Sequence, residues 1–189
     1  MTLLCDLDSI PSEATGGVIS IGNFDGVHRG HAGLLSRLKS MASVGGGPTV
    51  AITFDPHPAS ILRPEHAPIP LTTIERRAQL LGRQGIDFVI ACRPTRELLN
   101  LTADQFFDRV LLEKLSMRGI VEGPNFFFGR DRQGDTTTLK RLCSEQGIQI
   151  EIVDPQEIRG EMVSSSLIRK LIANGDLSDR RVRPLQDGI

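Results

Sequence analysis

The stretch GNFDGVHRGH, residues 22–31, lies directly after a short apolar run and before an amphipathic segment. Within ten residues it holds three glycines and two histidines, namely Gly22, Gly26, Gly30, His28 and His31. Glycine-rich turns that lead into a helix bind phosphate through backbone N–H groups, whereas two histidines three residues apart are also a partial metal site. The rest of the sequence must decide between a phosphate site and a metal site.

The residues on either side predict a strand before this stretch and a helix after it. GGVISIG (16–22) is short, rich in β-branched residues and bounded by glycine, as buried strands are. HAGLLSRLKSMAS (31–43) places its apolar residues at helical spacing. The stretch therefore joins the first predicted strand to the first predicted helix.

The remaining chain repeats this alternation. Apolar runs predict further strands at 48–54, 86–92, 118–123 and 148–154. Helices are predicted at 72–84, where Thr72 and Glu75 have capping-box spacing, and at 103–115, where Thr102 and Gln105 have the same spacing. The segment 55–71 carries five prolines and is predicted to be a long surface loop.

Buried strands that alternate with helices predict an α/β fold: a Rossmann-like, doubly wound parallel sheet of about five strands, covered by helices on both faces. Such sheets bind ligands beyond the carboxyl ends of their strands, where the strand order reverses. The stretch 22–31 follows the first strand and is expected to lie at that place.

Composition limits the classes of partner. With 22 Lys and Arg against 23 Asp and Glu, the net charge of −1 gives no general attraction to nucleic acid or to an anionic membrane. The cysteines, Cys5, Cys92 and Cys143, form no CxxC pair, which predicts free thiols. The N-terminal residues lack the basic region of a signal peptide, and no apolar run is long enough to cross a bilayer. We therefore expect a cytoplasmic protein that binds neither nucleic acid nor membrane; the sequence identifies no protein partner.

The two histidines favour an anionic ligand. His28 and His31 lie at the start of the predicted helix and can project toward one ligand. The free N–H groups and positive dipole of a helix N-terminus suit a phosphate, to whose oxygens imidazoles can donate. A metal site would need further ligands, for which Asp25 and His57 are the candidates. The glycines favour phosphate, and for either histidine alone an incidental place at a helix entry stays open.

A second cluster, TFDPHP (53–58), ends the second predicted strand. Asp55 and His57 are expected at the carboxyl edge of the sheet, in a turn that Pro56 and Pro58 stiffen. The alternative is a rigid turn that Asp55 caps.

A third cluster, GPNFFFGRDRQGD (123–135), follows the fourth strand. One phenylalanine is expected to line an apolar slot for a planar ring, while Arg130 or Arg132 pairs with phosphate. The alternative is that Phe126 and Phe128 plug the end of the sheet.

A fourth cluster, MVSSSLIRKLI (162–172), places three serines before a predicted helix. Ser164 and Ser165 can cap this helix and donate to a phosphate, with Arg169 and Lys170 just inside it. A serine N-cap is common, so the meaning of this cluster depends on the other three.

In this order and at these spacings, the four motifs resemble those of the FMN adenylyltransferase module of bacterial bifunctional FAD synthetases, in which a riboflavin kinase module follows. GNFDGVHRGH contains the HxGH signature of the nucleotidyltransferase superfamily, and TFDPHP, NFFFGRDRQGD and VSSSLIR look like the other signatures. The likeness covers about residues 16 to 177. It implies the HxGH nucleotidyltransferase fold over 1–177 and transfer of AMP from ATP, with Mg²⁺, to FMN, which gives FAD and pyrophosphate.

The resemblance also implies roles for individual residues. The catalytic residues would be His28, His31, Asn125, Ser164 and Arg169. The ATP contacts would be Gly22, Asn23, Phe24, Asp25, Gly26, Gly30 and Ser165. The FMN contacts would be Asp55, Pro56, His57, Pro58, Asn125, Phe126, Phe128 and Arg130. No metal ligand is assigned.

The chain departs from the family pattern in two ways. Leu167 stands where the usual Ser-Ser-Thr-Arg-Ile-Arg motif has an arginine. No riboflavin kinase module is expected after the short basic segment 178–189, which is predicted to be a flexible tail. The chain is then a stand-alone adenylyltransferase, a piece of a longer chain or a degenerate homologue. Two alternatives stay open: a nucleotidyltransferase that acts on pantetheine phosphate or nicotinamide mononucleotide, and a non-catalytic flavin- or nucleotide-binding homologue.

Overall fold

A six-stranded parallel sheet forms the centre of the protein, with strand order β1-β4-β3-β2-β5-β6. The computed structural model describes residues 1–154, 157–158 and 161–176. The strands are β1 (Thr2–Leu4), β2 (Val18–Ile21), β3 (Thr49–Phe54), β4 (Phe88–Cys92), β5 (Gly119–Glu122) and β6 (Gln149–Ile152). The strand order reverses between β2 and its neighbours β3 and β5, which confirms the doubly wound α/β fold.

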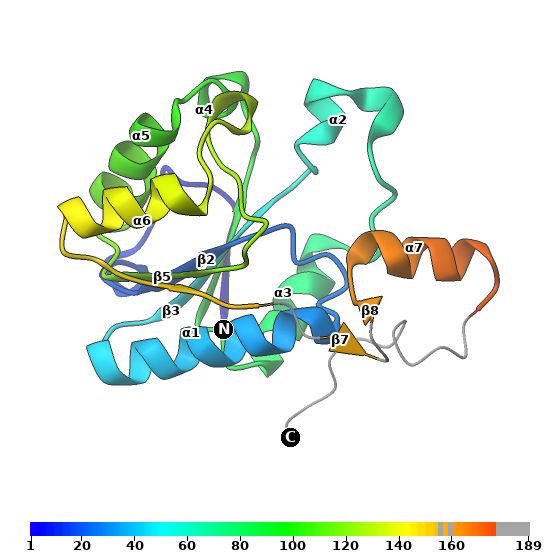
Figure 1. The fold of residues 1–189 in the computed structure, drawn as a ribbon, viewed down its shortest axis with the longest axis horizontal. Helices are drawn as coiled ribbons and strands as arrows, with labels where there is room; N and C mark the ends of the chain where they lie inside the picture. Colours follow the sequence, from blue (N-terminus) through cyan, green and yellow to red (C-terminus); the bar gives the residue numbers. More distant parts are fainter. Residues whose placement is uncertain (155–156, 159–160, 177–189) are drawn as a thin grey trace.

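Helices cover both faces of this sheet (Figure 1). On one face lie α1 (Ala32–Gly45) and α3 (Ile74–Arg83). On the other lie α5 (Ala103–Phe106), which continues into the π-helical stretch η4 (Phe107–Lys114), and α6 (Thr136–Glu145). The shorter elements are α2 (Ala59–Leu62), α4 (Arg96–Leu99), α7 (Ser165–Ala173), the antiparallel pair β7 (Glu157–Ile158) and β8 (Glu161–Met162), and the 3₁₀ turns η1 (Ser12–Ala14), η2 (Arg29–His31), η3 (Pro64–His66) and η5 (Arg130–Arg132).

The sheet is buried on both faces, which explains why its strands read as continuous apolar runs. Neighbouring residues of β2 enter different cores: Val18 packs with Leu38 of α1, whereas Ile19 packs with Phe107 and Leu139 of the other layer. Each such side chain removed from water contributes roughly 1.5–3 kcal/mol of transfer free energy. The two cores hold the sheet rigid and leave its carboxyl edge to carry loops.

The structure adds a strand to the main sheet, and the short pair β7–β8 outside it, that the sequence analysis did not predict. Residues Thr2–Leu4 form β1, a parallel edge strand whose Thr2 pairs with Phe88. The segment 55–71 is also more regular than predicted, because it contains α2 and η3. The helix predicted at 103–115 is present but becomes π-helical after Phe106.

One capping prediction is confirmed and one is wrong. Thr102 and Gln105 form the capping box of α5. At α3, however, the N-cap is Thr73, whose hydroxyl accepts from Arg76 N–H at 3.3 Å. The Thr72 hydroxyl donates to the Asp25 carboxylate instead, since a buried charge is a better partner than a helix end. The predicted tail 178–189, like residue 177 of the predicted domain, lies outside the described residues.

Candidate active site

The stretch 22–31 leaves β2 in an unusual backbone conformation. Phe24, Gly26 and Val27 have φ angles of 45°, 80° and 37°, all in the left-handed region. That region disfavours side chains with a Cβ, and a β-branched residue such as Val27 most of all. Backbone strain of this kind persists only where the surrounding contacts enforce it, and it concentrates at functional sites.

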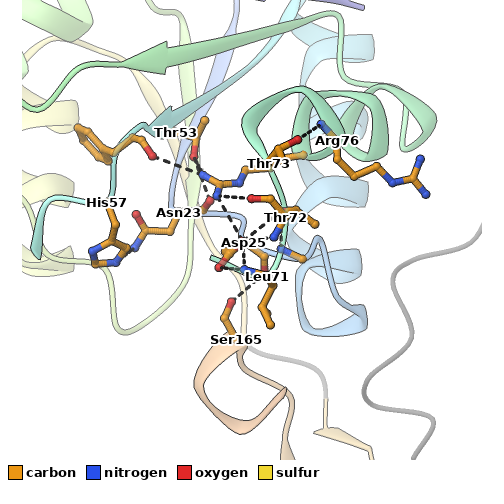
Figure 2. Close-up of polar contacts among 12 residues, drawn as sticks. Asn23, Asp25, Thr53, His57, Leu71, Thr72, Thr73, Arg76 and Ser165 are labelled. Carbon is orange, nitrogen blue, oxygen red and sulfur yellow. Dashed lines mark hydrogen bonds and ion pairs between the residues drawn. The ribbon is translucent and has the colours of Figure 1, made fainter. Parts of the chain in front are cut away.

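The buried carboxylate of Asp25 supplies those contacts (Figure 2). It accepts from Leu71 N–H at 2.9 Å and from both the N–H and the hydroxyl of Thr72 at 3.0 Å. It also pairs with the guanidinium groups of Arg77, at 3.3 Å, and Arg169. Burial by itself would raise the pKa of Asp25, but the Leu71 hydrogen bond and the Arg77 charge outweigh it and lower the pKa. Asp25 is therefore an ionised group held from several sides.

Further hydrogen bonds extend this Asp25 network to the other motifs. Arg77 Nη1 donates to Thr53 Oγ1 at 3.0 Å, and Thr53 Oγ1 donates to the Asn23 carbonyl at 2.9 Å. Ser165 Oγ donates to the Asp25 carbonyl at 2.9 Å, as Figure 2 shows. The first, second and fourth motifs are thus joined through one carboxylate and one guanidinium.

The fourth motif also contacts the long loop. Arg169 Nε donates to the Ile69 carbonyl at 2.7 Å, while its other end pairs with Asp25. Ser164 caps α7 by accepting from Leu167 N–H at 3.2 Å, as predicted. The prediction that Ser165 also caps this helix is wrong, because Ser165 is its first residue and its hydroxyl donates to Asp25. Leu167 takes part in the Ser164 cap through its backbone N–H, so leucine in place of the arginine of the family motif leaves the cap intact.

The two histidines lie against each other at the turn before α1. Their rings stack with centroids 3.8 Å apart, and Nδ1 of each ring is buried without a hydrogen-bond partner. Burial lowers the pKa of His28 to about 4. Burial, with the neighbouring His28 and Arg77, lowers the pKa of His31 well below its usual value. Both imidazoles are therefore neutral at pH 7 and can each donate one N–H.

Gly30 allows the histidine turn to approach the start of α7. A Cβ at this position would lie 2.3 Å from the Val163 carbonyl and 3.0 Å from His28 Nδ1. Any larger residue would push the two segments apart. His28 and the residue that precedes the N-cap of α7 therefore lie against the same glycine, which is an arrangement that suits phosphate.

The second motif also reaches the first. His57 Nε2 lies 3.0 Å from the Asn23 amide nitrogen, and His57 Nδ1 accepts from Ala59 N–H at 3.1 Å. Burial, followed by the charge of Arg169, lowers the pKa of His57. The His57 ring accepts the N–H of Ala59, and among the described residues no hydrogen bond to the Asp55 carboxylate supports the alternative in which Asp55 caps this turn. Asp55 and Pro56 are exposed, and Pro58 is half-buried.

The third motif lies apart from the Asp25 network. Phe128 is buried against Phe106, and Phe126 stacks on it with centroids 5.4 Å apart, so both rings close the end of one core. The exposed ring is Phe127, which carries the Arg132 guanidinium 4.4 Å from its centroid. Asn125 and Arg130 are exposed. Among the described residues no hydrogen bond or ion pair joins residues 125–130 to the Asp25 network, so their FMN contacts stay predictions.

Three functional candidates were not predicted. Arg77 and Thr72 join the network from α3 and its entry, and their signal was hidden because both read as ordinary helix residues. Glu122 ends β5, is almost fully buried and accepts from Ile21 N–H at 2.6 Å. Burial raises the pKa of Glu122 well above its usual value. An acid within the apolar run GIVE was a visible signal of such a site.

A metal-binding reading of the histidines gains no support. Within the described ranges no group of three or more His, Cys, Asp or Glu side chains is arranged to hold a metal ion. Asp25, a proposed additional ligand, is already bonded to arginines and amides.

Among the residues that the structure describes, no helix combines the length and the hydropathy that crossing a membrane requires.

In this chain an HxGH turn meets a helix N-terminus at the point where the strand order of a doubly wound sheet reverses. These features define a nucleotidyltransferase-type α/β protein. The family model described as FAD synthetase matches residues 10–167. The chain belongs to the FAD synthetase family.

Curated relatives agree with this assignment. The bifunctional riboflavin kinase/FMN adenylyltransferase of Pseudomonas fluorescens is 37% identical over 93% of this chain and 56% of its own length. The protein of the same name from Escherichia coli K12 is 32% identical over 92% of this chain and 55% of its own length. The chain therefore spans about half the length of the curated relatives that it matches. A crystal structure described as a macrolide-efflux protein from Streptococcus pneumoniae has the same fold, with a TM-score of 0.79 and 26% identity over 90% of this chain and 55% of that one.

We expect the network to be a major source of stability. Asp25→Asn leaves the buried guanidinium of Arg77 and the partly exposed guanidinium of Arg169 against a neutral amide, which should cost about 3–5 kcal/mol of unfolding free energy. Glu145→Gln breaks the exposed Arg141 pair and should cost no more than about 1 kcal/mol. Urea denaturation of both variants measures the difference; equal losses would contradict a central role for Asp25.

The neutral histidines predict a specific pH dependence of stability. The pKa of His28 is about 4 in the folded protein and 6.5 when unfolded, so between these values the unfolded state binds more protons. The unfolding free energy should therefore fall as the pH drops from 6.5 to 4, by on the order of 2–3 kcal/mol for this group. His28→Gln should flatten the curve, and His66→Gln, at an exposed position, is the matched substitution for comparison. Denaturation across this pH range is the measurement, and parallel curves for His28→Gln and the parent would refute the assignment.

Proposed function

We propose that this chain transfers the AMP group of ATP to FMN, giving FAD and pyrophosphate. The observation that carries the proposal is the joining of the histidine turn, the TFDPHP turn and the α7 N-terminus through Asp25 and Arg77. Membership of the FAD synthetase family supports FMN as the acceptor, in preference to pantetheine phosphate or nicotinamide mononucleotide.

The reaction needs little chemistry from the protein. An oxygen of the FMN phosphate attacks the α-phosphorus of ATP and forms a new P–O bond. The bond from the α-phosphorus to the β-phosphate bridge breaks, and its electron pair leaves with pyrophosphate. The attacking phosphate is already an anion, so no base is required. Alignment and stabilisation of charge then account for catalysis.

The site provides both. Two guanidinium groups face one carboxylate in the Asp25 network, which leaves an excess positive charge beneath the histidine turn. His28 and His31 donate neutral N–H groups to the ATP phosphates, while Ser164 and the α7 N-terminus receive the leaving pyrophosphate. The backbone of Gly22–Phe24 lies against the adenosine portion, alongside the other predicted ATP residues.

The flavin occupies the other side in this proposal. Asn125, exposed at the exit of β5, bridges the two substrates, and the turns at 55–58 and 126–130 receive the flavin and its phosphate. Mg²⁺ would enter with the phosphates of ATP. Free cysteines are typical of the reducing cytoplasm, and we propose that the protein is located there.

Histidine removal tests the phosphate-binding role. With Mg-ATP and FMN supplied, the parent protein should form FAD, which chromatography separates. His28→Ala or His31→Ala should lower kcat by about 100-fold or more, as loss of a preorganised donor does. His66→Ala, on the exposed η3 turn, is the control and should keep full activity. Absence of FAD with the parent protein would reject the proposal.

Acceptor choice is a separate test. FMN should be adenylylated, whereas riboflavin lacks the attacking phosphate and should give no product. Asn125→Ala should lower the affinity for FMN, measured by the quenching of its fluorescence, at least about tenfold. The affinity for ATP should change less, because the Asn125 amide lies on the flavin side. Equal use of FMN and pantetheine phosphate would instead favour a different nucleotidyltransferase.

A further inference from the structure

The strands β2 and β5 separate before they end. Their pairing stops at Ile19 and Ile120, although β2 still pairs with β3 through Ile21 and β5 still pairs with β6 through Glu122. This opening lies where the strand order reverses, which is where doubly wound sheets bind their ligands.

The Glu122 side chain spans the opening. Its Oε1 accepts the N–H of Ile21 at 2.6 Å, in place of the backbone carbonyl that a continued ladder would supply. The next amide along, Gly22 N–H, turns the other way and donates to Ile52 of β3. Without Glu122, the Ile21 N–H would be a buried donor that has lost its acceptor.

The two loops that leave this opening carry different substrates in the proposed reaction. Residues 22–31 follow β2 and hold ATP, whereas residues 123–135 follow β5 and hold FMN. Glu122 is adjacent to the second loop and bonded to the residue that precedes the first. Its single hydrogen bond is thus placed to fix the separation of the two loops.

We propose that Glu122 is a positioning residue that aligns the bound FMN phosphate with the α-phosphate of ATP by tying the end of β2 to the end of β5. This inference rests on the proposed function. Burial raises the pKa of Glu122, and an uncharged carboxyl serves the tie as well as an ionised one. The amide of glutamine offers the same acceptor oxygen, so the conservative variant should replace it.

Asp87 provides a matched control at the opposite edge of the sheet. Its Oδ2 accepts from the Thr49 N–H at 2.9 Å and so ties the start of β3 to the residue before β4. This is the same kind of carboxylate-to-amide bond, but it lies at the amino ends of the strands. Asp87→Ala should lower stability without changing turnover.

The test compares Glu122→Met, Glu122→Gln and Asp87→Ala with the parent protein in steady-state FAD formation. Methionine keeps the volume of the side chain but accepts no comparable hydrogen bond. We expect Glu122→Met to lower kcat at least about tenfold while both KM values change by less than about threefold, because misalignment affects chemistry more than binding. Glutamine should restore kcat to within about threefold of the parent. A Glu122→Met enzyme with full kcat, or a glutamine that fails to restore it, would overturn the inference.

Amide hydrogen exchange provides a readout that does not depend on activity. The Ile21 amide should be protected in the parent and in Glu122→Gln, and should exchange at least about tenfold faster in Glu122→Met. Asp87→Ala should leave the Ile21 amide protected. If the parent made no FAD, the proposed function would fall, while the exchange rates would still decide whether Glu122 ties the strands. Unchanged protection of Ile21 in Glu122→Met would overturn the tie itself.

Discussion

The buried charge of Asp25 is the constraint on which the site depends. An ionised carboxylate away from water is stable only when it is fully bonded, and here the partners come from α3 and its entry and from α7. Satisfying one carboxylate therefore determines where these segments lie. The same bonds hold the left-handed conformations of Phe24 and Val27, which the chain would not adopt alone.

In this arrangement the charged groups, Asp25 and its arginines, are distinct from the neutral rings of the two histidines. The arginines that compensate Asp25 stay close to the histidine turn and disfavour protonation of the imidazoles, since the charge of Arg77 contributes to the lowered pKa of His31. A neutral imidazole still carries one N–H that it can donate, and the positive charge beside the rings comes from the guanidinium groups. The hydrogen-bond donors and the positive charge therefore belong to different residues.

Most of the sheet could be predicted because buried parallel strands are apolar throughout and are punctuated by glycine and proline. The edge strand β1 was missed because three residues give too short a pattern, and its pairing with β4 is a tertiary event. The motifs could be found in the sequence, but the network that joins three of them could not: Thr72 resembled an N-cap, and Arg77 resembled a polar residue of an amphipathic helix. Only packing shows that both face Asp25. Likewise, the phenylalanine loop could not reveal which ring stays exposed.

The span of the Asp25 contacts has a consequence for the order in which the protein is made. Asp25 is 52 residues from Arg77 and 144 residues from Arg169. As the chain emerges from a ribosome, the first guanidinium arrives with α3, but the second arrives only after all six strands of the sheet have been synthesised. Until α7 packs in place, the Asp25 carboxylate can therefore pair with Arg77 but not with Arg169. The sheet can assemble before the corner that holds Asp25 does, so nascent chains that lack α7 would have the fold without the completed Asp25 network.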